Sequence, residues 1–220
     1  MAPTAPLYPV SLVVSGRKCL VVGGGPVAAR KAEGLLGAGA RVTVVAPEVI
    51  DTIRAWETAP PAGAGGAGRR LAIEVRPYRS PEAADYRLVI TATGRPEVDH
   101  AVFADADAAG VWVNSADDLD NCSFLLPAVH RAGSVTLAVS TGGASPALAG
   151  WLRSQVAGTL DFDVGVVAEL LDEARSLMKD TGTSTESLDW DRILDSQVVP
   201  LVRQGRIDEA RSVLRTLVDG

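Results

Sequence analysis

The sequence is poor in the residues that build disulfide frameworks and metal centres. It holds two cysteines and two histidines among 220 residues, and neither pair has the spacing of a zinc site or a Cys-x-x-Cys motif. Its apolar runs are well short of the roughly 20 residues that cross a membrane. We therefore expect reduced cysteines, no resident metal site and no binding to a membrane.

Positive charge is also in the minority. Lys and Arg number 21 against 27 Asp and Glu, for a net charge of −6. No basic stripe of the kind that binds nucleic acid is present. The first residues, MAPTAPLYP, have neither the basic nor the apolar region of a secretory leader. We therefore expect a cytoplasmic protein that does not bind nucleic acid, with enough apolar residues, 47% of the chain, to form a real core.

Short apolar runs alternate with helix-like segments over the first half of the chain. The pattern predicts strands at 17–22, 41–46, 71–76, 87–92 and 111–115, and helices at 26–36, 48–57 and 96–109. Such alternation is typical of an α/β fold whose parallel sheet is covered by helices on both faces. We therefore predict an N-terminal Rossmann-type parallel sheet.

The pattern changes beyond residue 120. One more strand is predicted at 134–140, and Ser145-Pro146 then has the favoured residues for a helix start. The rest is mostly helical, with breaks near Gly158 and at 180–186, whereas 59–68 is a low-complexity stretch that predicts a flexible loop. We expect a Rossmann domain at 1–126, a small α+β dimerisation region at 127–160 and a C-terminal helical domain at 161–220.

A glycine-rich loop joins the first strand to the first helix. The loop matches G-x-G-x-x-A and contains Gly23, Gly25, Pro26, Val27 and Ala28. In this motif the first glycine allows a tight turn, the second lets the backbone approach a pyrophosphate, and the small third residue lets helix and strand pack closely. Free N–H groups at the helix N-terminus then face the phosphates. This context favours a bound nicotinamide dinucleotide over a tight turn without a ligand.

Other residues at the ends of predicted strands are candidates for the same cofactor. Glu48 can reach the ribose hydroxyls, or the backbone near Pro47 can line the adenosine pocket; an exposed acid at a helix start is the alternative for Glu48. No Arg follows the strand to bind a 2′-phosphate, which favours NAD⁺ over NADP⁺. Thr93 follows a strand on the dinucleotide side. Asn114 can bind near the nicotinamide, orient the loop after it, or simply form a turn.

Three stretches together resemble one family. They are Val22 to Lys31, Val113 to Asp118 followed by Cys122 to Pro127, and Ala138 to Ala147 with Leu152 and Arg153 just beyond. In order and spacing they resemble the precorrin-2 dehydrogenase/sirohydrochlorin ferrochelatase family, the dehydrogenase-chelatase module of siroheme synthases. The resemblance covers about residues 7 to 160, and its third stretch is the most specific.

The resemblance implies the NAD-dependent oxidation of precorrin-2, a tetrapyrrole, to sirohydrochlorin. In many members it also implies insertion of Fe²⁺, as a chelation substrate, to give siroheme. It further implies a homodimer built from a Rossmann domain, a dimerisation region and a C-terminal helical domain. The dehydrogenase activity is the firmer expectation of the two.

Asp117 is the main catalytic candidate. It lies just past the strand at 111–115, where ligands of doubly wound sheets bind, and its place matches the family's catalytic aspartate. One carboxylate there can act as general base, for the oxidation or for removal of pyrrole protons. Asp118 and Asp120 fit turn-capping acids better than a metal cage, since the three acids lack the spacing of a calcium loop. We expect His100 on a helix surface and His130 to be exposed or hydrogen-bonded.

The third stretch is the candidate substrate site. It contains Ser140, Thr141, Gly142, Gly143 and Ser145. Glycine-rich backbone before a helix can form an anion-binding nest for the substrate's carboxylates. A plain glycine turn with Ser145 as the helix N-cap is the alternative, and both can hold at once. Arg153 can pair with a substrate carboxylate, or be an exposed arginine without a specific contact.

Two other functions fit the first half of the chain. One is a different NAD-dependent oxidoreductase, because a fold does not fix a function. That class usually brings a catalytic His, Lys or Tyr, or a zinc set, and no such constellation is evident in the sequence. The other is a non-catalytic NAD-sensing module, which leaves Ser140 to Pro146 and the long helical tail unexplained. A tetrapyrrole absorbance change on addition of NAD⁺ separates an enzyme from a sensor.

Overall fold

The computed structural model describes residues 6–61, 70–160, 162–180, 182, 184 and 188–219. Most of the loop predicted at 59–68 lies outside these residues. The chain divides into two compact units, one formed by residues 1–126 and 142–144 and the other by 127–141 and 145–220. Each unit is described by itself.

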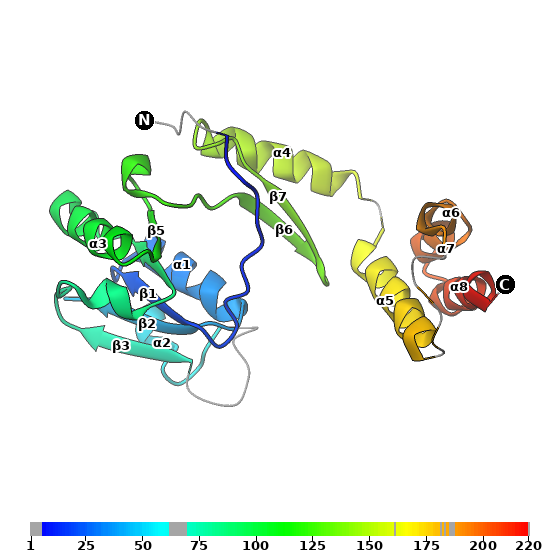
Figure 1. Cartoon of the computed structure of the whole chain (residues 1–220), viewed down its shortest axis with the longest axis horizontal. Coiled ribbons are helices and arrows are strands. Elements are labelled where there is room, and N and C mark those ends of the chain that lie inside the picture. Colours follow the sequence, from blue (N-terminus) through cyan, green and yellow to red (C-terminus); the bar gives the residue numbers. More distant parts are fainter. Residues whose placement is uncertain are drawn as a thin grey trace. The chain divides into compact units, whose positions relative to one another are not determined.

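The first unit is built on a five-stranded parallel sheet (Figure 1). Its strands are β1 (Lys18–Val22), β2 (Arg41–Ala46), β3 (Leu71–Val75), β4 (Leu88–Thr91) and β5 (Trp112–Ser115), in the order β3-β2-β1-β4-β5. The connections are α1 (Pro26–Gly37), α2 (Asp51–Ala55), the 3-10 turn η1 (Glu82–Asp85) and α3 (Pro96–Ala108), and the turn η2 (Leu119–Asn121) follows β5. The predicted α/β fold is confirmed. The chain reverses its winding direction between β1 and β4, and ligands of such sheets bind at the carboxyl ends beside that point.

Side chains of the central strand alternate between two apolar clusters. Cys19 and Val21 of β1 pack with α1, whereas Leu20 and Val22 pack with Val89 of β4 and with α3. Each fully buried apolar side chain of this kind stabilises the fold by about 1.5–3 kcal/mol. Because both faces are covered here, β1 and β4 are mainly apolar runs without polar alternation, which is why the sequence predicts them well.

The second unit begins with an antiparallel pair, β6 (Ala128–Ala132) and β7 (Val135–Val139), against which α4 (Pro146–Gly158) packs. Strand β7 was predicted, but β6 was not. The sequence of β6 places His130 and Arg131 between small or apolar residues, so it shows neither an apolar run nor a strict alternation. The pair is joined at Gly133, whose φ of 55° suits a glycine.

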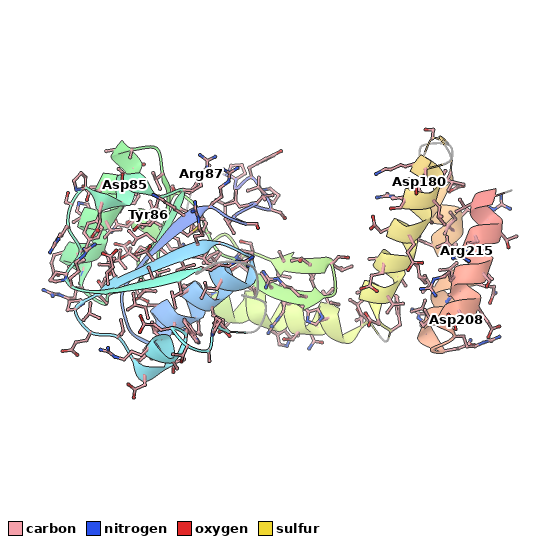
Figure 2. All side chains as sticks on the ribbon, turned by 90° about the horizontal axis from the view of Figure 1, so that it is seen from below. Asp85, Tyr86, Arg87, Asp180, Asp208 and Arg215 are labelled. Carbon is pink, nitrogen blue, oxygen red and sulfur yellow. The ribbon has the colours of Figure 1, made fainter. Side chains whose placement is uncertain are left out.

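Four further helices complete the second unit: α5 (Val164–Asp180), α6 (Trp190–Leu194), α7 (Val198–Arg203) and α8 (Ile207–Asp219). Their apolar faces form a core of their own around Leu170, Val198 and Leu214. On its outer side α8 is highly charged, and Figure 2 shows Asp208 and Arg215 along it. The predicted helix ends near Gly158 and residue 180 are confirmed. Among the described residues, no helix is both long and apolar enough to span a membrane.

Candidate functional site

The first two glycines of the loop after β1 are required by packing. Gly23 has a φ of 130°, and a Cβ there would lie 2.3 Å from the carbonyl oxygen of Ala92 at the end of β4. A Cβ on Gly24 would lie 1.9 Å from the carbonyl oxygen of Glu48, in the segment after β2. The same segment is fixed by the Ile50 N–H, which donates to the Gly24 oxygen at 2.9 Å. Gly23 and Gly24 therefore let the loop after β1 pack closely against the chain at the ends of β4 and β2.

Gly25 is different, because a Cβ there would meet no protein atom within 4 Å. Its φ of −88° is open to any residue, so neither strain nor packing explains a glycine at this position. Gly25 is the N-cap of α1, where no side chain caps the free N–H groups and no acid occupies the first turn. Behind it, the fully buried Ala28 lets α1 approach β1. Open space before uncapped N–H groups at a helix N-terminus fits a pyrophosphate.

The end of β2 is bounded by exposed and ion-paired groups. Pro47 and Glu48 are exposed, and α2 begins only at Asp51, so the prediction of a helix from residue 48 was wrong and Glu48 is not a helix-start acid. The reason is that the segment from Glu48 to Ile50 bonds to Gly24 instead. The neighbouring Arg76 donates through its guanidinium to Glu82 at 2.9 Å and pairs with Glu74 as well. These carboxylates raise the pKa of Arg76.

The end of β4 carries a buried carboxylate that sequence reasoning missed. Asp99, on α3, accepts hydrogen bonds from the hydroxyl of Thr91, and from Thr93 through its hydroxyl at 2.8 Å and its N–H at 3.3 Å. The Thr93 hydroxyl also accepts from the Arg95 N–H at 3.0 Å. Thr93 therefore joins the strand end to the start of α3, and its role toward a cofactor stays a prediction. No spacing in the sequence marks Asp99, which looks like an ordinary acid in a helix.

The end of β5 is bonded to the segment that follows it. Asn114, 5% exposed, donates through its side-chain amide to the Phe124 carbonyl at 3.0 Å and to the Cys122 sulfur at 3.4 Å. The N–H of Ser115 also donates to this sulfur, at 3.2 Å. These bonds hold the two ends of the loop from 116 to 121. Cys122 is half-buried, whereas Cys19 is fully buried.

Asp117 lies on that loop and is exposed to solvent. Its neighbour Asp118 caps η2, accepting from the Asp120 N–H at 3.0 Å and from the Asn121 amide at 2.9 Å. The prediction of a turn-capping acid is thus confirmed for Asp118. His100 is exposed on α3, as expected, and its Nδ1 lies 3.3 Å from the Asn121 side-chain oxygen. Asp117 precedes this turn and lies two residues beyond the end of β5, exposed to solvent.

Lys31, on α1, is a half-buried cation beside this loop. Burial and the neighbouring Arg30 lower the pKa of its ammonium, and the nearby Cys122 thiol and Asp117 carboxylate act in the opposite direction. Sequence reasoning included Lys31 in the first stretch of the resemblance but gave it no role. The sequence does contain one signal for it. Lys31 lies four residues after Val27, which places it on the same helix face as this residue of the cofactor loop.

The candidate substrate residues form a tightly bonded turn before α4. The Thr141 hydroxyl accepts from the Ser145 N–H and donates to the Ser145 carbonyl, both at 3.0 Å. Ser145 caps α4 by accepting from the Leu148 N–H at 3.2 Å, as predicted. Gly142 and Gly143 both have positive φ. Arg153 is half-buried and donates to the adjacent Ser154 at 3.1 Å, and its role toward a substrate stays a prediction.

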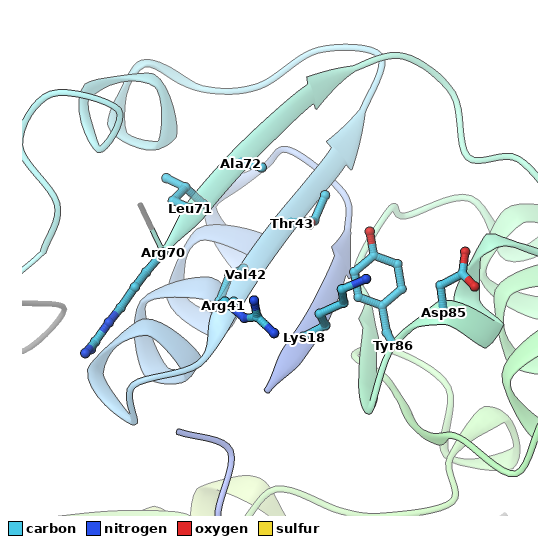
Figure 3. Close-up of a pocket in the computed structure, with 9 residues that line it drawn as sticks. All are labelled: Lys18, Arg41, Val42, Thr43, Arg70, Leu71, Ala72, Asp85 and Tyr86. Carbon is cyan, nitrogen blue, oxygen red and sulfur yellow. The ribbon is translucent and has the colours of Figure 1, made fainter. Parts of the chain in front are cut away.

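A hollow of about 320 Å³ lies at the opposite ends of the strands from the glycine loop (Figure 3). Lys18, Arg41, Thr43 and Tyr86 line it on one face of the sheet, near the amino ends of β1 and β2. It is separate from the residues discussed above. Within the described part of the chain, no group of three or more His, Cys, Asp or Glu side chains is placed to hold a metal ion.

The sheet order, the glycine loop and the uncapped start of α1 define a Rossmann-type dinucleotide-binding domain. Residues 10–128 match the model of a family described as "Putative NAD(P)-binding", and the chain belongs to this family. The cofactor is therefore of the NAD(P) type.

Siroheme synthases are similar to nearly the whole chain. That of Nitrosococcus oceani is 33% identical over 214 residues, covering 96% of this chain and 44% of the relative. That of Thioalkalivibrio sulfidiphilus is 36% identical over 216 residues, covering 96% and 42%. The chain thus spans less than half the length of these relatives.

A solved structure described as SirC, precorrin-2 dehydrogenase, has a similar fold. Its TM-score is 0.72 at 25% sequence identity, and the match covers 96% of this chain and 100% of that one. Together with the siroheme synthases, it confirms the family resemblance of the three sequence stretches.

Proposed function

We propose that this chain oxidises precorrin-2 to sirohydrochlorin with NAD⁺ as the acceptor. The observation that carries the proposal is the geometry around β1 and β5. Open space beside Gly25, at the uncapped start of α1, and an exposed acid at Asp117 both follow the carboxyl ends of strands of one parallel sheet. The likeness to SirC and to siroheme synthases supports the substrate class.

The reaction removes a hydride and a proton from the tetrapyrrole. NAD⁺, when bound, supplies the acceptor for the hydride. The N-terminus of α1 holds the pyrophosphate, and Gly23 and Gly24 shape the loop that exposes the N–H groups. Asp117 takes the proton as general base, on a loop whose two ends are held by Asn114. The position of Asn114 at the end of β5 also suits a contact with the nicotinamide.

The choice of NAD⁺ over NADP⁺ rests on the end of β2. Arg76 is adjacent, since its N–H donates to the Ala46 carbonyl at 2.9 Å, but its guanidinium is committed to Glu74 and Glu82. The exposed carboxylate of Glu48 would repel the 2′-phosphate of NADP⁺, and Arg76 is not available to neutralise it. We therefore expect NAD⁺ to bind at least tenfold more tightly than NADP⁺, as measured by calorimetry. Equal dissociation constants would contradict this choice.

The turn from Ser140 to Ser145 is proposed to bind a substrate carboxylate. Gly142 and Gly143 turn their backbone through left-handed conformations before the N-terminus of α4, where a negative charge is stabilised. Arg153 is proposed to add a charged contact to another carboxylate.

Insertion of Fe²⁺ into sirohydrochlorin is proposed as a second activity, supported by the likeness to siroheme synthases over 96% of the chain. Fe²⁺ is a substrate of this step, held mainly by the tetrapyrrole nitrogens. Asp117 would accept the pyrrole protons that the metal displaces, which is the same proton-accepting role as in the oxidation.

A homodimer is proposed from the exposed face of α4. Leu148, Trp151 and Val156 are 47%, 58% and 43% exposed, and the spacing of the first two puts them on one side of the helix. Sedimentation of the full chain should show a dimer, and Trp151→Glu should shift it to a monomer; a monomeric wild type would contradict the proposal. Free Cys19 and Cys122 suit the proposed reducing cytoplasmic location.

The experiment for the activity uses enzymatically generated precorrin-2 under anaerobic conditions. Addition of NAD⁺ to the purified chain should give the sirohydrochlorin spectrum and one NADH per product. Fe²⁺ is then added, and metallation faster than without protein supports the second activity. NAD⁺ binding without NAD⁺-dependent oxidation would overturn the dehydrogenase proposal and favour the dinucleotide-sensing alternative.

A further inference from the structure

Lys31 stands out among the charged groups near the candidate site because it is half-buried and lacks a direct partner. Within the described residues its ammonium forms no hydrogen bond or ion pair, although the Asp117 carboxylate and the Cys122 thiol lie within electrostatic range. Its neighbour Arg30 is exposed. A lysine can bury its apolar stem and keep its ammonium accessible, and an ammonium that is bound to no protein group is available to pair with an anion.

The position of Lys31 follows from the packing of α1 against the loop after β5. Phe124 packs on the apolar cluster that includes Ala28, Ala29 and Ala32 of α1. The bonds of Asn114 to Phe124 and Cys122 join this segment to the end of β5, and Cys122 lies within electrostatic range of Lys31. Lys31 lies one turn beyond Val27, on the helix face shared with the cofactor loop. It therefore shares a helix face with the cofactor loop and lies within electrostatic range of Asp117.

We propose that Lys31 binds a carboxylate of the tetrapyrrole substrate beside Asp117. This inference rests on the proposed function and adds a substrate-binding residue to that site. The chemistry matches because precorrin-2 carries acetate and propionate side chains around its whole ring. A base that takes a proton from the ring must lie near such side chains, and without a cation its own negative charge would repel them. Lys31 supplies that cation from α1, within electrostatic range of the base.

The test compares Lys31→Met with two other variants in the full chain. Met keeps the long apolar stem of lysine and removes only the charge, so the buried part of the side chain stays filled. Lys31→Arg keeps the charge. Arg30→Gln removes one positive charge from the adjacent, exposed position and controls for general electrostatic attraction.

Two quantities are measured for each variant: the KM for precorrin-2 at saturating NAD⁺, and the dissociation constant for sirohydrochlorin, the octacarboxylate product, by absorbance. Loss of a charge-assisted hydrogen bond should raise both by about tenfold or more in Lys31→Met. Lys31→Arg should recover most of the loss, and Arg30→Gln should stay within about twofold of wild type. The dissociation constant for NAD⁺ should not change in any variant.

Equal sirohydrochlorin binding by Lys31→Met and wild type would overturn the inference, as would an equal loss in Arg30→Gln or a loss confined to NAD⁺ binding. The proposed activity is judged separately by turnover of the wild type. If wild type binds sirohydrochlorin but does not oxidise precorrin-2, the activity fails, and the binding constants alone still decide the role of Lys31. If wild type binds no tetrapyrrole, both fail.

Discussion

The side-chain amide of Asn114 donates a hydrogen bond to the carbonyl oxygen of Phe124 at 3.0 Å, and this bond joins the end of β5 to the segment that follows the Asp117 loop. The two residues lie ten positions apart and close a loop around η2. Because Asn114 is 5% exposed, the bond is largely shielded from water. The position of the proposed base therefore depends on a side chain that does not itself need to touch the substrate.

Asn114→Ala should lower both stability and turnover. Removal of the amide leaves the Phe124 carbonyl without this donor, which costs about 1–3 kcal/mol in the free energy of unfolding. The freed loop should also lower kcat for precorrin-2 oxidation. Urea unfolding and steady-state kinetics measure the two effects.

Ser115→Ala is the matched control on the next residue of the strand. Its buried hydroxyl has no hydrogen-bond partner in the described structure, so its removal should leave stability within about 0.5 kcal/mol of wild type or raise it. If Asn114→Ala were as stable as Ser115→Ala, the Asn114 bonds would not hold the loop.

Gly24→Ala and Gly25→Ala should separate folding from cofactor binding. A Cβ on Gly24 would overlap the Glu48 carbonyl, 1.9 Å away, so Gly24→Ala should destabilise the fold by several kcal/mol or prevent it from folding. A Cβ on Gly25 meets no protein atom within 4 Å, so Gly25→Ala should unfold like wild type. It should nevertheless weaken NAD⁺ binding by about tenfold or more, because the methyl group fills the phosphate cradle. Thermal unfolding and calorimetry test the pair, and NAD⁺ binding by Gly25→Ala with wild-type affinity would count against the cradle.

Cys19 should make stability fall in alkaline solution. Burial raises the pKa of its thiol from 9.0 to about 11. Between these values the unfolded chain releases a proton that the folded chain keeps, so a rise in pH favours unfolding. The contribution is complete below about pH 9 and is lost as the pH rises toward 11. From pH 8 to 10, wild type should therefore lose more unfolding free energy than Cys19→Ala; parallel losses in urea titrations would contradict this.

The sequence predicts the β1–α1–β2 unit closely because each of its signals is local. Buried strands are apolar runs in the sequence. The G-x-G-x-x-A motif from Gly23 to Ala28 lies between a strand and a helix, so it marks the end of one and the start of the other. The missed features depend on contacts that only the folded chain shows. Asp99 has a structural role because Thr91 and Thr93 donate hydrogen bonds to its carboxylate. Gly24 has one because the carbonyl of Glu48, in the segment after β2, lies against it. Strand β6 was missed because its pairing with β7, rather than its own composition, makes it a strand.

The most direct test of the account is the NAD⁺-dependent oxidation of precorrin-2 by wild type, Asp117→Ala and Asp120→Ala under anaerobic conditions. Asp120 is an exposed acid three residues from Asp117, so the two variants remove the same charge from the same loop. The account predicts that Asp117→Ala binds NAD⁺ normally but loses about 100-fold or more in kcat, as expected for removal of a general base, while Asp120→Ala retains most activity. Undiminished turnover in Asp117→Ala would contradict the account.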